Sequence, residues 1–549
     1  MTRNNTGVPP FSSDDRACGM LLHVTSLPSP HGIGDFGPSA LSWIDRLDQA
    51  GQSWWQTLPL GPTGYTNSPY QSISSFAANP LLVSPEWLVE DGLLNAHDLA
   101  HPSLPEAFVD YDSVLPFKLR LLAKAWENFK SGGHSDLQSD HEQFCHEHHH
   151  WLKDYALFRV LKAKFGDAHY LDWPPEVVQR KPAALGRLRR ELADQIGEAS
   201  FAQFLLFRQA NRMKAYAHEK GVGLIGDLPF FVSGDSSDVW ANHQLFLLDE
   251  NRRPRVVAGV PPDYFSVTGQ LWGNPLYNWE ALRKSGYRWW IARLRSLLNH
   301  VDLIRLDHFR AFLAAWHIPA DAPTAQTGTW LPGPGDEFFV AVKRKLDHLP
   351  FIAEDLGMIT PDVYALRDKF QLPGMRVLQF AFEGDSTNPH LPENYVENAV
   401  VYTGTHDNPP TRGWFEELPA EEQERVWKYL RERGAKSSEA ARALMELGWS
   451  SRAALAVAPL QDLLNLGTET RMNVPGRPED NWRWRATEEM LADRSFEWLG
   501  ELTKNANRTR ASVAADSRAL ESVSTNQGKT AKEHEDGNPR YTGRAIEEY

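Results

Sequence analysis

The chain has 549 residues, of which 42% are hydrophobic and 23% charged, a composition typical of a globular protein with a large core. Lys and Arg number 57 and Asp and Glu 71, giving a formal net charge of −14. This acidic balance excludes the basic surface that nucleic acid or an anionic membrane would require, so neither is expected as a partner.

Eight short apolar runs recur along the chain, and several are nearly continuous, as strands buried on both faces of a parallel sheet are. Helical patterns lie between them, and Thr360 with Pro361 is typical of a helix N-cap followed by proline at the first helical position. Eight strands alternating with helices predict an α/β fold, a (β/α)8 TIM barrel; a doubly wound open sheet is the alternative, because strand order cannot be read from sequence. The predicted strands lie within residues 19–27, 53–60, 221–230, 301–309, 350–357, 375–382, 399–408 and 453–464, and the clearest helices between them within 41–51, 288–300 and 360–372.

The uneven spacing of these strands predicts insertions into the barrel. About 160 residues separate the second strand from the third, far more than one crossover helix needs. Strong helical patterns at 151–166 and 201–221 indicate a largely helical subdomain inserted at about 61–220. A smaller insertion is expected at about 409–452, and barrel and insertions together make one catalytic unit over residues 1–504.

The two ends of the chain differ from the rest in composition. The first fifteen residues lack the apolar segment of a signal peptide, and no apolar run is long enough to span a bilayer. The only cysteines, Cys18 and Cys145, exclude a disulfide framework and favour a reducing compartment, so we expect a cytoplasmic protein. Residues 505–549 have almost no large apolar side chains, and we expect a disordered C-terminal tail there.

Charged residues interrupt the predicted strand in LIRLDHFRAF, residues 303–312. Side chains alternate along a strand, so Arg305 and Asp307 would share one face, and the arginine would favour the ionised form of the aspartate. Carboxylates also stand at the ends of three other predicted strands, as Asp227, Glu354 and Asp407. A single one is usually a helix cap, but four at equivalent strand ends predict a shared acidic pocket at the C-terminal face, equipped for splitting glycosidic bonds.

Two metal hypotheses are weaker. The carboxylates with His308 or His406 have the chemistry to bind a divalent ion, but no two histidines there have a ligand spacing. The histidines of HEQFCHEHHHW, residues 141–151, would scatter round a helix, which favours a solvated helix over a zinc site. There is no Walker loop and no GxGxxG after a strand, so neither a metal nor a nucleotide cofactor is expected.

Some of the aromatic residues lie in Gly/Pro-rich segments. GQLWGNPLYNW, residues 269–279, is predicted to be a loop, and flat aromatic faces in loops suit stacking on sugars or bases. The acidic net charge argues against bases. The Gly-rich stretches near 328–335 are interpreted as loop residues only.

LIRLDHFR, IAEDLG and YTGTHDN, in this order, resemble the 4-α-glucanotransferase family, the amylomaltases or disproportionating enzymes of the α-amylase clan. LPLGPTGYTNSPYQSISSFAANP (58–80), GDLPFFVSGDSSDVWAN (226–242), GVPPDYFSVTGQLWGNPLYNW (259–279), GTETRMNVPG (467–476) and NWRWR (481–485) agree with it. The resemblance covers roughly 18–500 and implies an enzyme that transfers segments of α-1,4-glucans to the 4-hydroxyl of maltooligosaccharides or glucose.

The resemblance also implies roles for individual residues. Asp307 would be the nucleophile, Glu354 the general acid/base and Asp407 the transition-state stabiliser. The residues expected to bind or position the sugar are Tyr70, Asp227, Asp263, Trp272, Asn278, Arg305, His308 and His406. The sequence departs from the family pattern at Pro409 and Pro410, where the family commonly has Asp-Thr, and at Ala311, where it often has glycine. An α-glucan hydrolase with the same chemistry remains an alternative, and a non-catalytic glucan-binding protein is disfavoured by the intact carboxylates.

Overall fold

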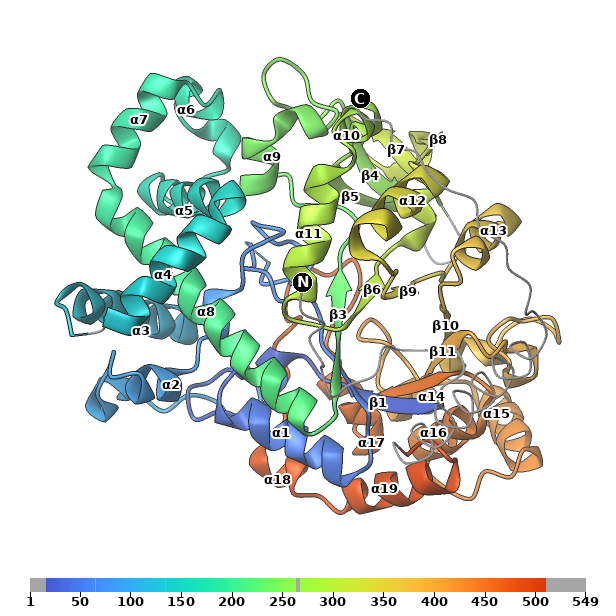
Figure 1. The fold of residues 1–549 in the computed structure, drawn as a ribbon. Coiled ribbons are helices and arrows are strands. Elements are labelled where there is room, and N and C mark those ends of the chain that lie inside the picture. The colour runs from blue at the N-terminus through green and yellow to red at the C-terminus, as the bar shows by residue number, and fades with distance from the viewer. Residues whose placement is uncertain (1–15, 65, 134, 263–266, 510–549) are drawn as a thin grey trace, which may run out of the picture.

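The structure is a computed structural model that describes residues 16–509, except 65, 134 and 263–266. Its centre is a closed barrel of parallel strands, each paired with the strands before and after it in the barrel (Figure 1). The order is β1-β2-β3-β6-β9-β10-β11-β12, which confirms the barrel over the open sheet. The strands are β1 (Ala17–Leu21), β2 (Trp54–Gln56), β3 (Gly223–Leu228), β6 (Leu303–Leu306), β9 (Phe351–Ala353), β10 (Gly374–Val377), β11 (Ala399–Tyr402) and β12 (Leu455–Pro459).

Each barrel strand lies within one of the eight predicted runs or overlaps it, but is shorter. Every residue of β3, β6, β11 and β12 is buried, which explains why these runs are apolar on both faces. Several of the strands end directly before a polar residue. Glu354, for example, directly follows β9, and Asp307 directly follows β6. The C-terminal parts of the predicted runs therefore lie beyond the strands, at the face where catalytic groups gather.

Helices cover the barrel as predicted. The helices expected at 41–51, 288–300 and 360–372 are α1 (Pro38–Gln49), α11 (Arg288–Leu298) and α13 (Pro361–Lys369). Thr360 is the N-cap residue of α13, but its hydroxyl bonds Asp362 rather than a backbone amide. α12 (Gly335–Leu346) precedes β9.

The segment between β2 and β3, where an insertion is expected, is helical. Figure 1 shows most of its helices gathered to one side of the barrel. α8 continues from that group to the barrel, where it packs on α1 and leads into β3. The predicted helices 151–166 and 201–221 are found as α5 and α8. The elements are α2 (Pro85–Glu90), α3 (Tyr111–Lys130), α4 (Ser135–Glu147), α5 (His149–Lys164), α6 (Pro175–Val178), α7 (Pro182–Glu191) and α8 (Ala193–Glu219).

The histidine-rich stretch 141–151 forms the end of α4 and the start of α5, with His148 between the two helices. His146, His149 and His150 are exposed, as in the solvated-helix interpretation. Over residues 16–509 without the gaps given above, no group of three or more His, Cys, Asp or Glu side chains is placed to hold a metal ion. Among the same residues, no helix has both the length and the apolar character needed to cross a bilayer.

A second sheet was not predicted. β4 (Val256–Val260), β5 (Gln270–Pro275), β7 (Ala314–Pro319) and β8 (Thr329–Pro332) form an antiparallel sheet in the order β5-β4-β7-β8. The interpretation of 269–279 and of 328–335 as loops is therefore wrong over β5 and β8. These strands are short, partly exposed and rich in Gly and Pro, and β4 pairs with β7 more than fifty residues later, so no local pattern announces them.

The remaining helices are α9 (Ser237–Ala241) and α10 (Trp279–Lys284), then α14 (Thr411–Glu417), α15 (Ala420–Glu432) and α16 (Ala440–Ser450) between β11 and β12, where the smaller insertion is expected. α17 (Leu460–Leu463), α18 (Glu488–Leu491) and α19 (Ser495–Asn505) follow β12. Beyond α19, Arg508 is fully buried, so packed structure extends past the boundary expected at 505. The rest of the expected tail, 510–549, lies outside the described residues.

Candidate active site

Arg305 connects two of the carboxylates that the sequence places at strand ends. Its Nη1 lies 2.8 Å from both carboxylate oxygens of Asp227 and 3.0 Å from Oδ1 of Asp307. The Asp227 side chain is fully buried, whereas that of Asp307 is 27% exposed. The shared face of Arg305 and Asp307 is therefore confirmed. One buried guanidinium thus pairs with two carboxylates and leaves one of them, Asp307, open to a ligand.

Asp227 is expected to contact a sugar, but in the structure its carboxylate bonds other protein groups. Its carboxylate also accepts a hydrogen bond of 2.7 Å from the Tyr70 hydroxyl, so both oxygens are used within the protein. Burial is the main cause that raises its pKa, and the guanidinium of Arg305 opposes this effect. We correct the expectation accordingly: Asp227 holds Arg305 and Tyr70 in place from behind the open part of the site.

Glu354 lies directly after β9 and is held by backbone amides. Oε2 accepts from the amide of His308 at 2.7 Å, and Oε1 accepts from the amide of Leu356 at 2.9 Å. His308 has a left-handed conformation, with φ 51°, which turns its amide toward the glutamate. Burial, with a smaller contribution from the charge of Asp307, raises the pKa of Glu354 to about 8, although Arg305 and the two amides act in the opposite direction. Glu354 is therefore protonated at neutral pH beside a partly exposed aspartate.

Asp407 comes from the loop after β11. Its Oδ1 accepts from Asn473 Nδ2 at 2.6 Å and lies 3.4 Å from His406 Nε2. Arg471 donates to its backbone carbonyl. The Asp407 side chain is 44% exposed, so the carboxylate is both held by neighbours and accessible.

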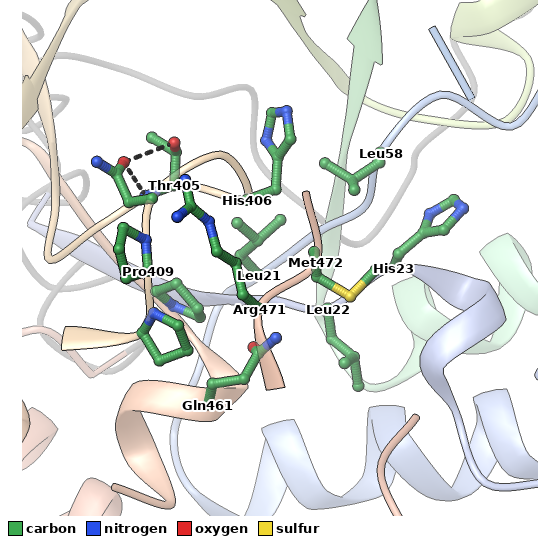
Figure 2. A pocket seen from close by; sticks show the side chains of 13 residues that line it. Leu21, Leu22, His23, Leu58, Thr405, His406, Pro409, Gln461, Arg471 and Met472 are labelled. Carbon is green, nitrogen blue, oxygen red and sulfur yellow. Dashed lines mark hydrogen bonds between the residues drawn. The ribbon is translucent and has the colours of Figure 1, made fainter. Parts of the chain in front are cut away.

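Aromatic rings pack beside these carboxylates. The ring of Tyr70 stacks on His406 with centroids 5.2 Å apart and an interplanar angle of 12°, and Trp482 packs against both rings. His406 lines a pocket at the barrel mouth (Figure 2). Pro409 and Thr405 lie on one side of it and His23 and Leu58 on the other.

Trp272 belongs to β5 of the small sheet, not to a free loop. Its ring meets the His308 ring edge to face, with centroids 5.0 Å apart, and its Nε1 donates to Gln270 at 3.1 Å. Burial lowers the pKa of His308 to about 4, so the imidazole is neutral. The small sheet thus brings an aromatic side chain to the residue that follows Asp307.

One residue expected to bind a sugar, Asn278, caps a helix in the structure. Asn278 is the N-cap of α10: its Oδ1 accepts from the amide of Ala281 at 3.1 Å, and its Nδ2 donates to the carbonyl of Gln244. Asn278 therefore has a structural part in the start of this helix, and its contact with a sugar hydroxyl stays a prediction. Asp263 lies outside the described residues.

Residues that sequence reasoning left without a part also shape the site. Asn473 and Arg471 hold Asp407, and Trp482 packs on Tyr70. Their segments, 467–476 and 481–485, resemble the family. Nothing in the sequence alone connects them to a strand end some sixty residues earlier.

A closed barrel with a protonated glutamic acid and an arginine-paired aspartate at adjacent strand ends defines an enzyme acting on glycosidic bonds. The family model described as 4-alpha-glucanotransferase matches residues 22–491. The chain belongs to this family and is an enzyme of this type.

Individual relatives agree. The chain is 47% identical to the 4-alpha-glucanotransferase of Synechocystis sp., over 88% of this chain and 96% of the relative. It is 47% identical to that of Thermus thermophilus, over 86% and 94%. Among solved structures, amylomaltase from Streptococcus agalactiae in complex with acarbose superposes with a TM-score of 0.87 at 36% identity, covering 90% of this chain and all of that one. Neither the hydrolase nor the non-catalytic alternative is favoured by these relatives.

Proposed function

We propose that Asp307 is the nucleophile, Glu354 the general acid/base and Asp407 the transition-state stabiliser of glucan transfer. The observation that carries this assignment is the contrast between the first two carboxylates. Glu354 is buried and has a pKa raised to about 8, while Asp307 is partly exposed and paired with Arg305. One group can therefore donate a proton at neutral pH and the other can attack as an anion.

The reaction proceeds in two displacements. Asp307 attacks the anomeric carbon of a donor α-1,4-glucan while Glu354 gives its proton to the leaving glycosidic oxygen, which departs as a free 4-hydroxyl. The product is a β-linked glycosyl ester on Asp307. Glu354, now ionised, takes the proton from the 4-hydroxyl of an acceptor. That oxygen attacks the anomeric carbon, and the ester bond to Asp307 breaks. Two inversions retain the α configuration.

Asp407 supports both displacements through its charge. The transition state resembles an oxocarbenium ion, and a carboxylate held in position beside it is stabilising without forming a bond. Asn473 and His406 both hold Oδ1 of Asp407, so little reorganisation is needed when positive charge develops. Retaining enzymes of this kind place nucleophile and acid roughly 5 to 5.5 Å apart, which leaves no room for a water between them.

We propose that donors are α-1,4-glucans and that acceptors are maltooligosaccharides or glucose. The Tyr70 and Trp272 rings offer stacking surfaces of the kind that sugars use, and they adjoin His406 and His308. Chromatography of products from maltotriose tests the proposal. Transfer gives glucose together with longer maltodextrins and almost no net gain in reducing ends. A steady rise in reducing ends without longer products would instead make the chain a hydrolase.

A further inference from the structure

Asp462 is a buried carboxylate that the proposed mechanism does not use. It lies in α17, directly after the last barrel strand, and only 1% of its surface is exposed. Three hydrogen bonds reach it, from the Thr403 hydroxyl and from the amide and hydroxyl of Thr411, the last two both at 2.7 Å. No Lys, Arg or His forms an ion pair with it in the part of the chain that the structure describes. A buried carboxylate without a cation is costly and needs a reason.

The residues that bond Asp462 are the two ends of the loop that carries Asp407. Thr403 directly follows β11, and Thr411 is the first residue of α14. The loop between them leaves the barrel and returns to the same carboxylate. Both ends of a nine-residue segment, 403–411, are therefore fixed to a single side chain of the neighbouring strand end.

Gln379 completes this network from the third side. Its Nε2 donates to the carbonyl of Pro409 at 3.0 Å and to the Thr411 hydroxyl at 3.1 Å. The Thr411 hydroxyl thus accepts from Gln379 and donates to Asp462. The Gln379 amide also lies so close to Gly404 that a Cβ there would come within 2.7 Å of Nε2. A larger residue than glycine would push the amide off the loop.

Within the loop, the remaining bonds fix the backbone around Asp407. Asn408 Oδ1 accepts from the amide and the hydroxyl of Thr405 at 2.9 and 2.8 Å, and the amide of Asp407 points to the Thr405 hydroxyl at 3.3 Å. Pro409 and Pro410, where the family commonly has Asp-Thr, have no backbone N–H to donate. The return of the loop to the barrel therefore depends on Gln379 and Asp462 for its hydrogen bonds.

We infer that Asp462 is a positioning residue for Asp407, acting through Thr403 and Thr411. This inference rests on the proposed part of Asp407 in the transition state. A carboxylate that stabilises developing charge must stay in place, and a displacement of about 1 Å in such a group can cost about 100-fold in rate. Because a single carboxylate accepts hydrogen bonds from both ends of the loop, it fixes the distance between these two ends.

Asp462→Asn tests the inference with almost no change of shape. The backbone amide of Thr411 is a donor, so the side-chain oxygen of the asparagine must face it. The new NH₂ group then faces the hydroxyls of Thr403 and Thr411, which in the parent both donate to Asp462. The Thr411 hydroxyl already accepts from Gln379. We expect kcat for maltotriose disproportionation to fall about 10- to 100-fold, with a much smaller change in KM. Asp98→Asn is the control, because Asp98 is also a buried carboxylate, 5% exposed, but belongs to a turn in the helical segment before α3. It should lower the thermal midpoint and leave kcat unchanged.

A double-substitution cycle separates positioning from a general structural effect. If Asp462 acts through Asp407, Asp462→Asn has no further effect on kcat when Asp407→Ala is already present. A full additional loss in that background would overturn the inference. The pair Thr411→Ser and Thr411→Val gives a second test if Asp462→Asn does not fold. Serine keeps the hydroxyl and should retain kcat, while valine has the same shape and should reproduce the loss.

The same measurements keep the two proposals apart. Near-normal kcat in Asp407→Ala would contradict the proposed part of Asp407 itself. A nearly inactive Asp407→Ala together with fully active Asp462→Asn and Thr411→Val would leave that proposal standing and overturn only the positioning by Asp462.

Discussion

Glu354 illustrates how the site sets the protonation of a single residue. Two backbone amides and Arg305 favour its ionised form, yet burial outweighs them and raises its pKa to about 8. The same burial keeps water away from the proton that the leaving group needs. A glutamate with an ordinary pKa would be ionised at neutral pH and useless as an acid in the first displacement.

The activity of the enzyme should depend on this proton. As the pH rises through about 8, Glu354 loses it, so kcat/KM for maltotriose should fall on the alkaline side with a midpoint there. Rates measured across the pH range check this. With α-maltosyl fluoride as donor, whose leaving group needs no proton, single-turnover fluoride release should lack that alkaline limb. An identical limb for both donors would assign the ionisation to another group.

The raised pKa of Glu354 should also lower the stability of the folded protein at neutral and alkaline pH. The folded-state pKa lies above the ordinary value of 4.5, so the folded state keeps a proton that the unfolded state loses between about pH 4.5 and 8. The free energy of unfolding therefore falls as the pH rises through this window. Glu354→Gln removes the ionisation, so its thermal midpoint should match the parent near pH 4.5 and exceed it increasingly up to pH 8. A constant difference at all pH values would contradict the raised pKa.

At the scale of elements, the site depends on strand ends and on the small sheet. Asp307 and Glu354 follow adjacent parallel strands, β6 and β9, which places them side by side without any special loop. The sheet of β4, β5, β7 and β8 then adds Trp272 above His308. Catalytic groups thus come from the barrel, and one wall of the site comes from a separate sheet.

Trp272 should influence the choice between transfer and hydrolysis. Its partly exposed ring, edge to face on His308, can stack on an acceptor sugar and exclude water from the glycosyl-enzyme. Trp272→Ala should lower transfer more than hydrolysis, so reducing ends per bond cleaved should rise. Trp330→Ala is the matched control, because Trp330 lies in β8 of the same sheet but packs under Arg310. An equal change of the product ratio in both variants would mean that the sheet is merely destabilised.

The elements also show what sequence can predict. Buried parallel strands announce themselves as continuous apolar runs, and carboxylates at their ends, such as Glu354, stand out against them. β5 and β8 have no such signal, because they are short edge strands whose residues are half exposed. The sequence also did not predict that Asn473 holds Asp407 or that Asp227 is buried. Both facts arise from contacts between segments that only folding brings together.

At the scale of the whole molecule, the segment after α19 links the first strand of the barrel to the chain that enters its last strand. The Arg508 guanidinium donates to the backbone carbonyls of Ala17, Trp449, Ser451, Ala453 and Ala454, at 2.7 to 3.3 Å. It is completely buried at the N-terminal end of β1 and β12. Residues on both sides of the barrel closure therefore share one side chain.

Truncation at two positions tests this arrangement. A chain ending after Asn505 lacks Arg508 and its hydrogen bonds to five backbone carbonyls, of which those of Ser451, Trp449 and Ala454 keep a second donor. Each buried carbonyl left without a donor costs about 1–3 kcal/mol, so the thermal midpoint should fall by several degrees. A chain ending after Thr509 keeps the arginine and loses only residues with few large apolar side chains. It should match the full chain in midpoint and in activity. Equal midpoints for both truncations would show that Arg508 contributes nothing to closure.

The assignment of Asp307 and Glu354 is the centre of this account, and trapping the intermediate tests it most directly. In Glu354→Ala, α-maltosyl fluoride can still glycosylate the nucleophile, but no base remains to activate an acceptor, so the ester should accumulate. Mass spectrometry of proteolytic peptides is predicted to find a maltosyl adduct on the peptide that contains Asp307, and Asp307→Ala in the same background should remove it. An adduct on a different carboxylate, or fluoride release without any adduct, would contradict the proposed mechanism.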